Sequence, residues 1–144
     1  MSVDRLAAWA SGVAVIAAVI AGFVLSGTPL EQRLKRLDAS RVSDLQQLSY
    51  ALDAYWEERQ SLPGTLDVLV DGRRLSRLPV DPVTREPYSY RAIVEPRAGY
   101  RLCATFALAS DASAPEQFWS HPAGQHCYEF EAGRNAARVP ALRR

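Results

Sequence analysis

The sequence has 144 residues, of which 48% are hydrophobic, and a formal net charge of +1. This length allows one domain and an appendage, and the near-neutral charge gives no indication of nucleic acid as a partner. The hydrophobic residues are unevenly distributed, because no charged residue occurs between Leu6 and Leu30. We therefore expect an apolar N-terminal segment followed by one domain with a single core.

The first predicted element is an apolar run from Leu6 to Leu25. Twenty helical residues at about 1.5 Å each span roughly 30 Å, which is the thickness of the hydrocarbon layer of a bilayer. A cleaved signal peptide is the alternative, but its apolar core is about 7–15 residues long and ends at a small-x-small site. The exit FVLSGTP offers no such site. The sequence therefore predicts a retained transmembrane helix within residues 1–27.

Small residues recur every four positions along this run, at Ala10, Ala14, Ala18 and Gly22. They share one helix face, and such faces let helices approach closely in lipid. The pattern predicts a packing face for the transmembrane helices of other subunits. Frequent use of alanine in a GC-rich genome is the alternative explanation.

A long amphipathic helix is predicted over residues 29 to 60. Thr28 is its candidate N-cap, Pro29 suits the first position and Glu31 the third, while Pro63 disfavours helix in the residue before it. Apolar residues form one stripe at Leu30, Leu34, Leu37, Leu45, Leu48, Leu52 and Tyr55. Polar residues mostly face away at Arg33, Arg36, Ser43, Asp44 and Gln47.

A short helix is predicted next, with Thr65 as its cap and Gly72 as its stop. The following loop is expected to tuck Leu75 and Leu78 beneath it. The stretch DPVTREPYSY, residues 81–90, then predicts a stiff turn that directs Tyr88 and Tyr90 towards the long helix.

Three antiparallel strands are predicted over residues 88–94, 100–108 and 126–130. Alternation places one face of each strand inward. The inward residues are Tyr88, Tyr90, Ala92, Val94, Tyr100, Leu102, Ala104, Phe106, Leu108, His126, Tyr128 and Phe130. The leucine stripe of the helix is expected to cover this face. The predicted fold class is α+β, in which a transmembrane segment (1–27) precedes the domain (28–130) and a basic C-terminal tail (131–144) follows it.

The domain resembles the soluble half of type IV pilin-like proteins, and most of all the major pseudopilin of type II secretion. In that family a helix reading A-L-x-x-Y precedes a proline, a short leucine-containing helix and a proline-rich turn into the sheet. The matching positions are Ala51, Leu52, Tyr55, Pro63, Leu66, Leu69, Leu78, Pro79, Asp81, Pro82, Pro87, Tyr88 and Tyr90. The resemblance covers roughly residues 42 to 106 and implies a pilin-like fold. The prepilin cleavage motif is absent, and Thr28-Pro29 interrupts the continuous helix that pilins use to build a fibre.

Cys103 and Cys127 are the only cysteines, and both lie in predicted strands. We predict a disulfide between them, which would close a loop of about 25 residues and contribute about 3 kcal/mol. An even cysteine count on a membrane-anchored domain favours an oxidising compartment, with two buried free thiols as the alternative.

The arginines that follow the apolar run would by themselves favour a cytoplasmic domain. This rule weakens for long translocated domains, and the cysteines and the family resemblance favour the opposite side. The predicted location is therefore the bacterial inner membrane, with a single span and a periplasmic domain.

Candidate chemistry is sparse. His121, His126 and Cys127 lack a fourth zinc ligand, and Asp111 and Glu116 are too few for a calcium cage. We predict no catalytic residue, no metal and no cofactor. Phe118 and Trp119 lie in a polar loop and are expected either to fold back onto the domain or to contact a partner.

The predicted function is that of a non-enzymatic accessory subunit of a larger membrane protein complex, with respiratory or photosynthetic complexes as plausible hosts. Its partners would be other membrane subunits, contacted through the span and the domain, and the lipid bilayer. The alternative is a divergent pseudopilin or minor pilin-like component of a secretion or pilus apparatus.

Overall fold

The computed structural model describes Trp9, residues 12–17, Val19, Gly22, and residues 28–94, 97–110 and 118–133. The chain divides into two compact units, Met1–Leu34 and Lys35–Arg144. Within the described residues, no helix combines the length and the apolar character needed to cross a membrane. The predicted transmembrane helix and the basic tail fall mostly outside these residues, so both stay predictions.

The long helix α2 runs from Pro29 to Arg59 and confirms the helix predicted over residues 29 to 60. The Thr28 hydroxyl oxygen accepts the backbone N–H of Glu31 at 3.2 Å, which is the expected N-cap. At the other end Gln60 has a φ of 52° and its N–H donates to the carbonyl of Trp56 at 2.8 Å. A left-handed residue of this kind commonly ends a helix.

The leucine stripe of α2 enters the core over only part of its length. Leu45, Leu48 and Leu52 are fully buried, whereas Leu30 is 66% exposed. The prediction that the whole stripe is covered is therefore wrong at its N-terminal end. The 31 residues of α2 extend about 46 Å, while an eight-residue strand extends about 27 Å, so the helix outruns the sheet that covers it.

The segment after α2 forms a 3-10 helix, η1, over Leu66–Leu69, which is shorter than the predicted helix. Thr65 makes no side-chain cap, and the helix ends when the N–H of Val70 donates to the carbonyl of Asp67 at 3.0 Å. Gly72 is therefore not its stop. The buried residues Leu66, Leu69 and Leu75 attach this segment to the core.

The sheet consists of β1 (Ser89–Ile93), β2 (Gly99–Phe106) and β3 (Gly124–Glu131), in the order β1-β2-β3. Both pairs are antiparallel, which confirms the predicted meander. Gly99 lies opposite Glu131, and a Cβ at this position would sit 2.4 Å from the Phe130 carbonyl oxygen. Only glycine fits so close to a neighbouring backbone.

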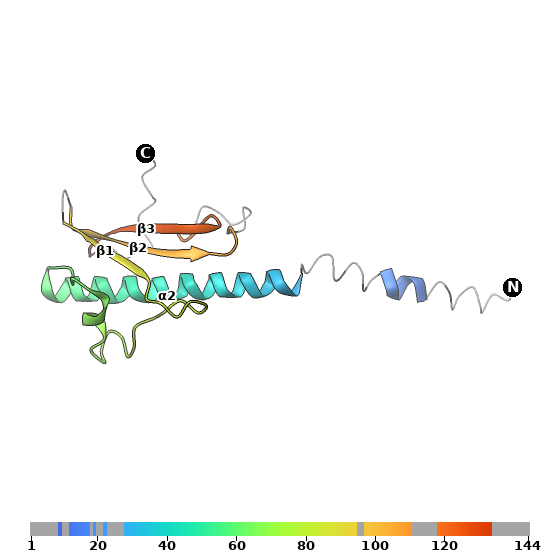
Figure 1. Cartoon of the computed structure of the whole chain (residues 1–144), viewed down its shortest axis with the longest axis horizontal. Helices are drawn as coiled ribbons and strands as arrows, with labels where there is room; N and C mark the ends of the chain where they lie inside the picture. The colour runs from blue at the N-terminus through green and yellow to red at the C-terminus, as the bar shows by residue number, and fades with distance from the viewer. Residues whose placement is uncertain are drawn as a thin grey trace. The chain divides into compact units, whose positions relative to one another are not determined.

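The inner face of the sheet carries the predicted aromatic and aliphatic side chains. The buried ones are Tyr100, Leu102, Ala104, Phe106, Tyr128 and Phe130. Val94 was wrongly predicted to face inward, because it lies beyond β1 and is 79% exposed. Leu108 lies beyond the end of β2, where it is half-buried. Figure 1 shows the sheet on one side of α2 and the segment that joins α2 to β1 on the other side. The middle of α2 therefore packs between two layers.

Candidate functional site

A buried cluster of charged side chains joins three parts of the domain. Arg41 on α2 donates from Nε to Asp81 at 2.7 Å and from Nη1 to Asp38 at 2.8 Å. The Asp38 carboxylate also accepts the backbone N–H groups of Ala107 and Leu108, at 2.9 and 2.8 Å. Each of the three charged residues is at most 9% exposed. The cluster therefore connects α2, the turn before β1 and the chain that leaves β2.

Asp81 organises its own turn. Its Oδ1 accepts the N–H groups of Val83 and Thr84, at 2.8 and 3.0 Å, and its carbonyl accepts the N–H of Arg85 at 2.9 Å. Its N–H donates to the carbonyl of Glu86 at 2.9 Å. Residues 81–86 thus form a turn that is held by hydrogen bonds among its own residues.

The electrostatics of the cluster favour the charged forms. Burial alone would raise the pKa of Asp81, but the hydrogen bonds from Arg41 and from the turn N–H groups outweigh it and lower the pKa to about 2. The hydrogen bond to Asp81 is the main reason that the pKa of Arg41 is raised. Asp81 is therefore ionised at any pH above about 3.

The two tyrosines after the turn have different targets. The Tyr88 hydroxyl donates to Asp44 on α2 at 2.7 Å, as predicted. Tyr90 donates to the carbonyl of Pro63 at 2.8 Å, in the loop just beyond the helix, and its side chain packs against the core to which α2 contributes. Asp44 was wrongly expected to face away from the domain. Burial, and then the Asp44 carboxylate, raise the pKa of Tyr88, so it stays a hydrogen-bond donor.

A second carboxylate, Asp53, is buried near the end of α2. The Tyr100 hydroxyl lies 3.1 Å from its Oδ1 and 3.2 Å from the carbonyl of Ser49. Oδ2 has no hydrogen-bond partner among the described residues. Burial raises the pKa of Asp53 to about 6, although the hydrogen bond with the Tyr100 hydroxyl and the nearby Gly133 N–H, which lies outside normal hydrogen-bond geometry, lower it.

We expect Asp53→Asn to remove a pH dependence of stability. The folded pKa of about 6 exceeds the ordinary 3.8, so this group stabilises the fold below pH 4 and loses that contribution as pH rises through 6. The full shift in pKa from 3.8 to about 6 corresponds to a loss of about 3 kcal/mol in the free energy of unfolding. Urea unfolding at pH 4 and at pH 7 measures it. The exposed Asp67→Asn is the control and should keep the wild-type pH dependence, and a variant at Asp53 that also keeps it would contradict the assignment.

The aromatic pair Phe118 and Trp119 folds back onto the inner side of β3. Phe118 lies 5.2 Å from the ring of Phe130, Trp119 lies 4.9 Å from the ring of Tyr128, and the Tyr128 hydroxyl donates to the Trp119 carbonyl at 2.9 Å. Both side chains are half-buried. The pair therefore covers the part of the core that lies over β3. Only its solvent-exposed atoms are available for the predicted contact with a partner.

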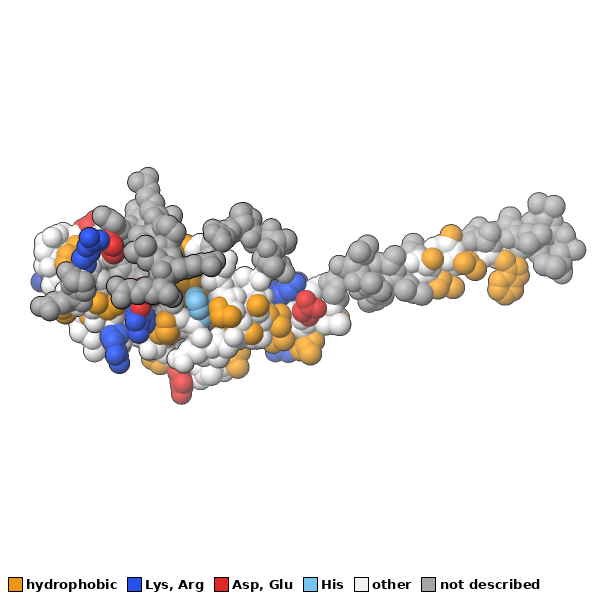
Figure 2. Space-filling model, turned by 90° about the horizontal axis from the view of Figure 1, so that it is seen from above, with side chains coloured by type: hydrophobic (Ala, Val, Ile, Leu, Met, Phe, Trp, Pro, Cys, Tyr) orange, Lys and Arg blue, Asp and Glu red, His pale blue; other side chains and the backbone are white. Residues whose placement is uncertain are grey.

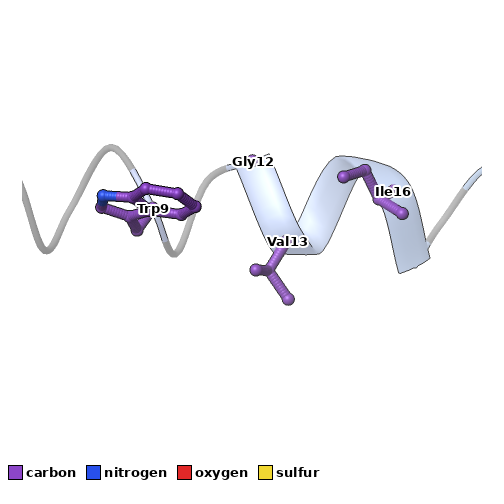
Figure 3. A pocket seen from close by; sticks show the side chains of 4 residues that line it. All are labelled: Trp9, Gly12, Val13 and Ile16. Carbon is purple, nitrogen blue, oxygen red and sulfur yellow. The ribbon is translucent and has the colours of Figure 1, made fainter.

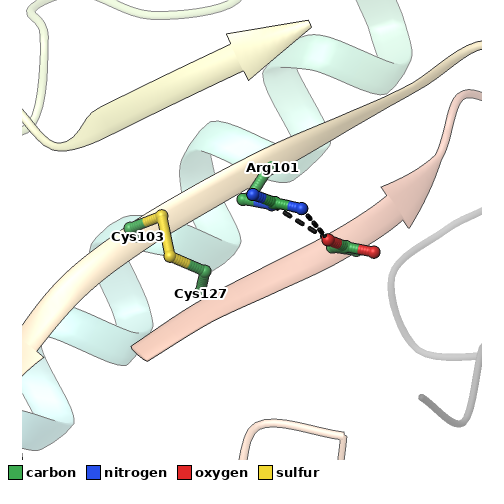
Figure 4. The surroundings of a disulfide bond; sticks show 4 residues. Arg101, Cys103 and Cys127 are labelled. Carbon is green, nitrogen blue, oxygen red and sulfur yellow. Dashed lines mark hydrogen bonds and ion pairs between the residues drawn. A yellow bond between two sulfur atoms is a disulfide. The ribbon is translucent and has the colours of Figure 1, made fainter. Parts of the chain in front are cut away.

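The predicted disulfide between Cys103 and Cys127 is confirmed, and it joins directly opposed residues of β2 and β3. It lies on the outer face of the sheet, with Cys127 exposed, next to the ion pair between Arg101 and Glu129 (Figure 4). In the view from above, basic and acidic side chains lie near one another on this side of the molecule (Figure 2). The outer face therefore carries an exposed ion pair beside the disulfide, unlike the apolar inner face.

Replacing both cysteines with serine is expected to lower the free energy of unfolding by about 3 kcal/mol without loss of the fold. The bond lies outside the core, so the inner face keeps its packing. Urea unfolding gives the loss and circular dichroism shows whether the fold persists. If the double variant were unfolded, the disulfide would be required for folding, which would contradict this expectation.

The residues weighed as metal ligands have other roles. His121 stacks on Phe106 with ring centroids 3.6 Å apart, and His126 packs edge-on against Tyr128 at 4.7 Å. Cys127 is in the disulfide and points to the other sheet face. In the described part of the chain, no three His, Cys, Asp or Glu side chains are placed to hold a metal ion. Asp111 and Glu116 lie outside that part.

Among the described residues of the N-terminal unit, Trp9, Gly12, Val13 and Ile16 line a shallow apolar hollow of about 230 Å³ (Figure 3). All four residues come from neighbouring turns of one segment. Ala14 and Gly22 of the predicted packing face are helical, whereas Ala10 and Ala18 lie outside the described residues. The packing face therefore stays a prediction.

Comparison with protein-family models, with curated proteins and with solved structures found no match to this chain.

The sequence reasoning missed the buried roles of Asp38, Arg41 and Asp53. A local signal existed for the first two, because an acid three residues before an arginine forms an i, i+3 pair. Their position on the stripe side of α2, between Leu34 and Leu45, was the further indication. Nothing local identified Asp81 as the partner of Arg41, since 40 residues separate them.

Proposed function

We propose that this chain is a non-enzymatic accessory subunit of a larger membrane protein complex. A single N-terminal helix would anchor it in the bacterial inner membrane, and its pilin-like domain would lie in the periplasm. Respiratory and photosynthetic complexes are plausible hosts. The partners would be other membrane subunits and the lipid bilayer.

The observation that carries the proposal is that the carboxylates and hydroxyls described above hold the elements of the domain together. Carboxylates, hydroxyls and imidazoles are the groups that general acid–base catalysis employs. Here Asp38, Arg41 and Asp81 fasten α2 to the turn and to β2. The pairs Tyr88–Asp44 and Tyr100–Asp53 fasten the sheet and its entry to the same helix. These groups make a rigid platform, which suits a scaffolding role.

Two further features support the proposed location. The charge-free run from Leu6 to Leu30 is long enough for a membrane anchor. The disulfide is typical of oxidising compartments such as the periplasm.

The test is gentle detergent extraction of native membranes, followed by mass spectrometry of the proteins that co-purify with the full chain. We expect defined subunits in fixed ratio, together with an uncut N-terminus that begins at Met1. A protein that runs alone as a monomer would rule the proposal out.

A second proposal is a divergent pseudopilin or minor pilin-like component of a secretion or pilus apparatus. It is favoured by the order of elements, in which a long helix, a short helix, a proline-bounded turn and an antiparallel sheet follow one another. This function predicts a trimmed and methylated N-terminus. Mass spectrometry of the mature protein therefore separates the two proposals.

A further inference from the structure

The turn between Asp81 and Pro87 keeps a strained arginine at its tip. Arg85 has a φ of 63°, in the left-handed region that favours glycine. Its side chain is exposed, and it makes no ion pair with any described residue. The strain therefore brings no visible benefit to the isolated domain.

The other non-glycine residue with a positive φ has a structural explanation. Gln60 ends α2, and its side-chain amide donates to the carbonyl of Trp56 at 3.2 Å. The backbone at Arg85 closes the turn onto Asp81, but glycine would close it equally well and without strain. What glycine would lack is the guanidinium.

The tip of this turn, residues 83–86, is also held by internal hydrogen bonds when no partner is bound. The N–H groups of Val83, Thr84, Arg85 and Glu86 are all satisfied within the turn. Asp81 at its base is held by the buried Arg41. Binding of a partner to such a tip therefore costs little backbone conformational entropy in this protein.

We propose that this tip is a docking element for an acidic surface on a neighbouring protein subunit, with Arg85 pairing to a carboxylate. Val83, which is 60% exposed, adds an apolar contact beside it. Guanidinium pairs with carboxylate through two parallel hydrogen bonds, which fixes orientation as well as position. A lipid surface fits less well, because membrane attraction needs several cations and Glu86 lies next to this single one. The inference rests on the accessory-subunit function proposed above.

The experiment uses the scarcity of lysine in this chain, since Lys35 is the only one in the sequence. Arg85→Lys keeps the charge and places an amine at the tip, where a water-soluble carbodiimide joins it to a carboxylate in direct contact. Arg91→Lys is the matched control, because Arg91 is exposed and makes no ion pair within the described part of the chain. Both full-length variants are extracted with their membrane partners, treated, and analysed by mass spectrometry.

We expect the Arg85→Lys variant to give a two-chain product, in which the introduced amine is joined to an aspartate or glutamate of another subunit. This product should be at least tenfold more abundant than any product through the amine introduced by Arg91→Lys. Arg85→Asn, which tolerates the left-handed backbone, and Arg85→Gly should both lose most of the co-purifying subunit. Arg85→Gly should at the same time have a higher Tm than the wild type.

Three results would overturn the inference: equal products through the two introduced amines, a product of twice the mass of this chain, or wild-type recovery of the partner by Arg85→Gly. Each of these results is compatible with co-purification of the wild-type chain with other subunits. Each would therefore overturn the docking inference and leave the proposed function standing. If the wild-type chain itself co-purifies with nothing, it is the proposed function that fails.

Discussion

Replacing Arg41 with methionine is expected to lower the free energy of unfolding by about 4 kcal/mol. The change leaves Asp38 and Asp81 buried at 4% and 9% exposure without the cation between them. Removal of the cation is costly because both carboxylates stay buried and lose their counter-charge, while only their backbone N–H donors remain. Urea unfolding of the full chain in detergent, followed by tryptophan fluorescence, measures the loss.

Arg36→Met is the matched control for this experiment. Arg36 lies on the same helix and is exposed, so its replacement should change stability by less than about 0.5 kcal/mol. Equal losses at the two positions would show that charge in α2, rather than the buried cluster, is what matters.

Leu48→Ala is expected to cost about 4 kcal/mol, whereas Leu30→Ala should cost less than about 0.5 kcal/mol. Both leucines belong to the one stripe that the sequence shows along α2, but Leu48 is 0% exposed and Leu30 is 66% exposed. The first replacement leaves a cavity among packed side chains, and the second removes apolar atoms from a surface that is already in contact with water. Urea unfolding of the two variants under identical conditions gives the difference, and similar losses would contradict the placement of the core.

Features governed by neighbouring residues were predicted from the sequence. The ends of α2 follow from Thr28-Pro29 and from the break before Pro63, and the structure places the helix at Pro29–Arg59. Alternation in residues 100–106 and 126–130 gave the inner faces of β2 and β3. Those two faces put Cys103 and Cys127 on the same outer side of the sheet, and the register of β2 with β3 pairs them directly.

Features governed by contacts between distant segments were not predicted. Charged residues on a helix are usually exposed, so the position of Arg41 on the leucine side of α2 did not by itself predict its burial. Its partner Asp81 lies 40 residues away in the sequence. Periodicity identified the side of α2 that carries leucine, but it contains no information about how far the sheet reaches along the helix. Leu30 was misplaced for that reason. The cap expected at Thr65 failed because the 3-10 turn closes through backbone groups alone.

The contacts that fasten α2 to the rest of the domain join residues far apart in sequence: Arg41 and Asp81 are separated by 40 residues, and Asp38 and Leu108 by 70. Closing loops of this length is entropically unfavourable, so such contacts form after the helix and the hairpins have already condensed. The buried cluster therefore forms late in folding and stabilises the native state more than the transition state. Its loss should appear as faster unfolding, while the rate of folding stays nearly the same.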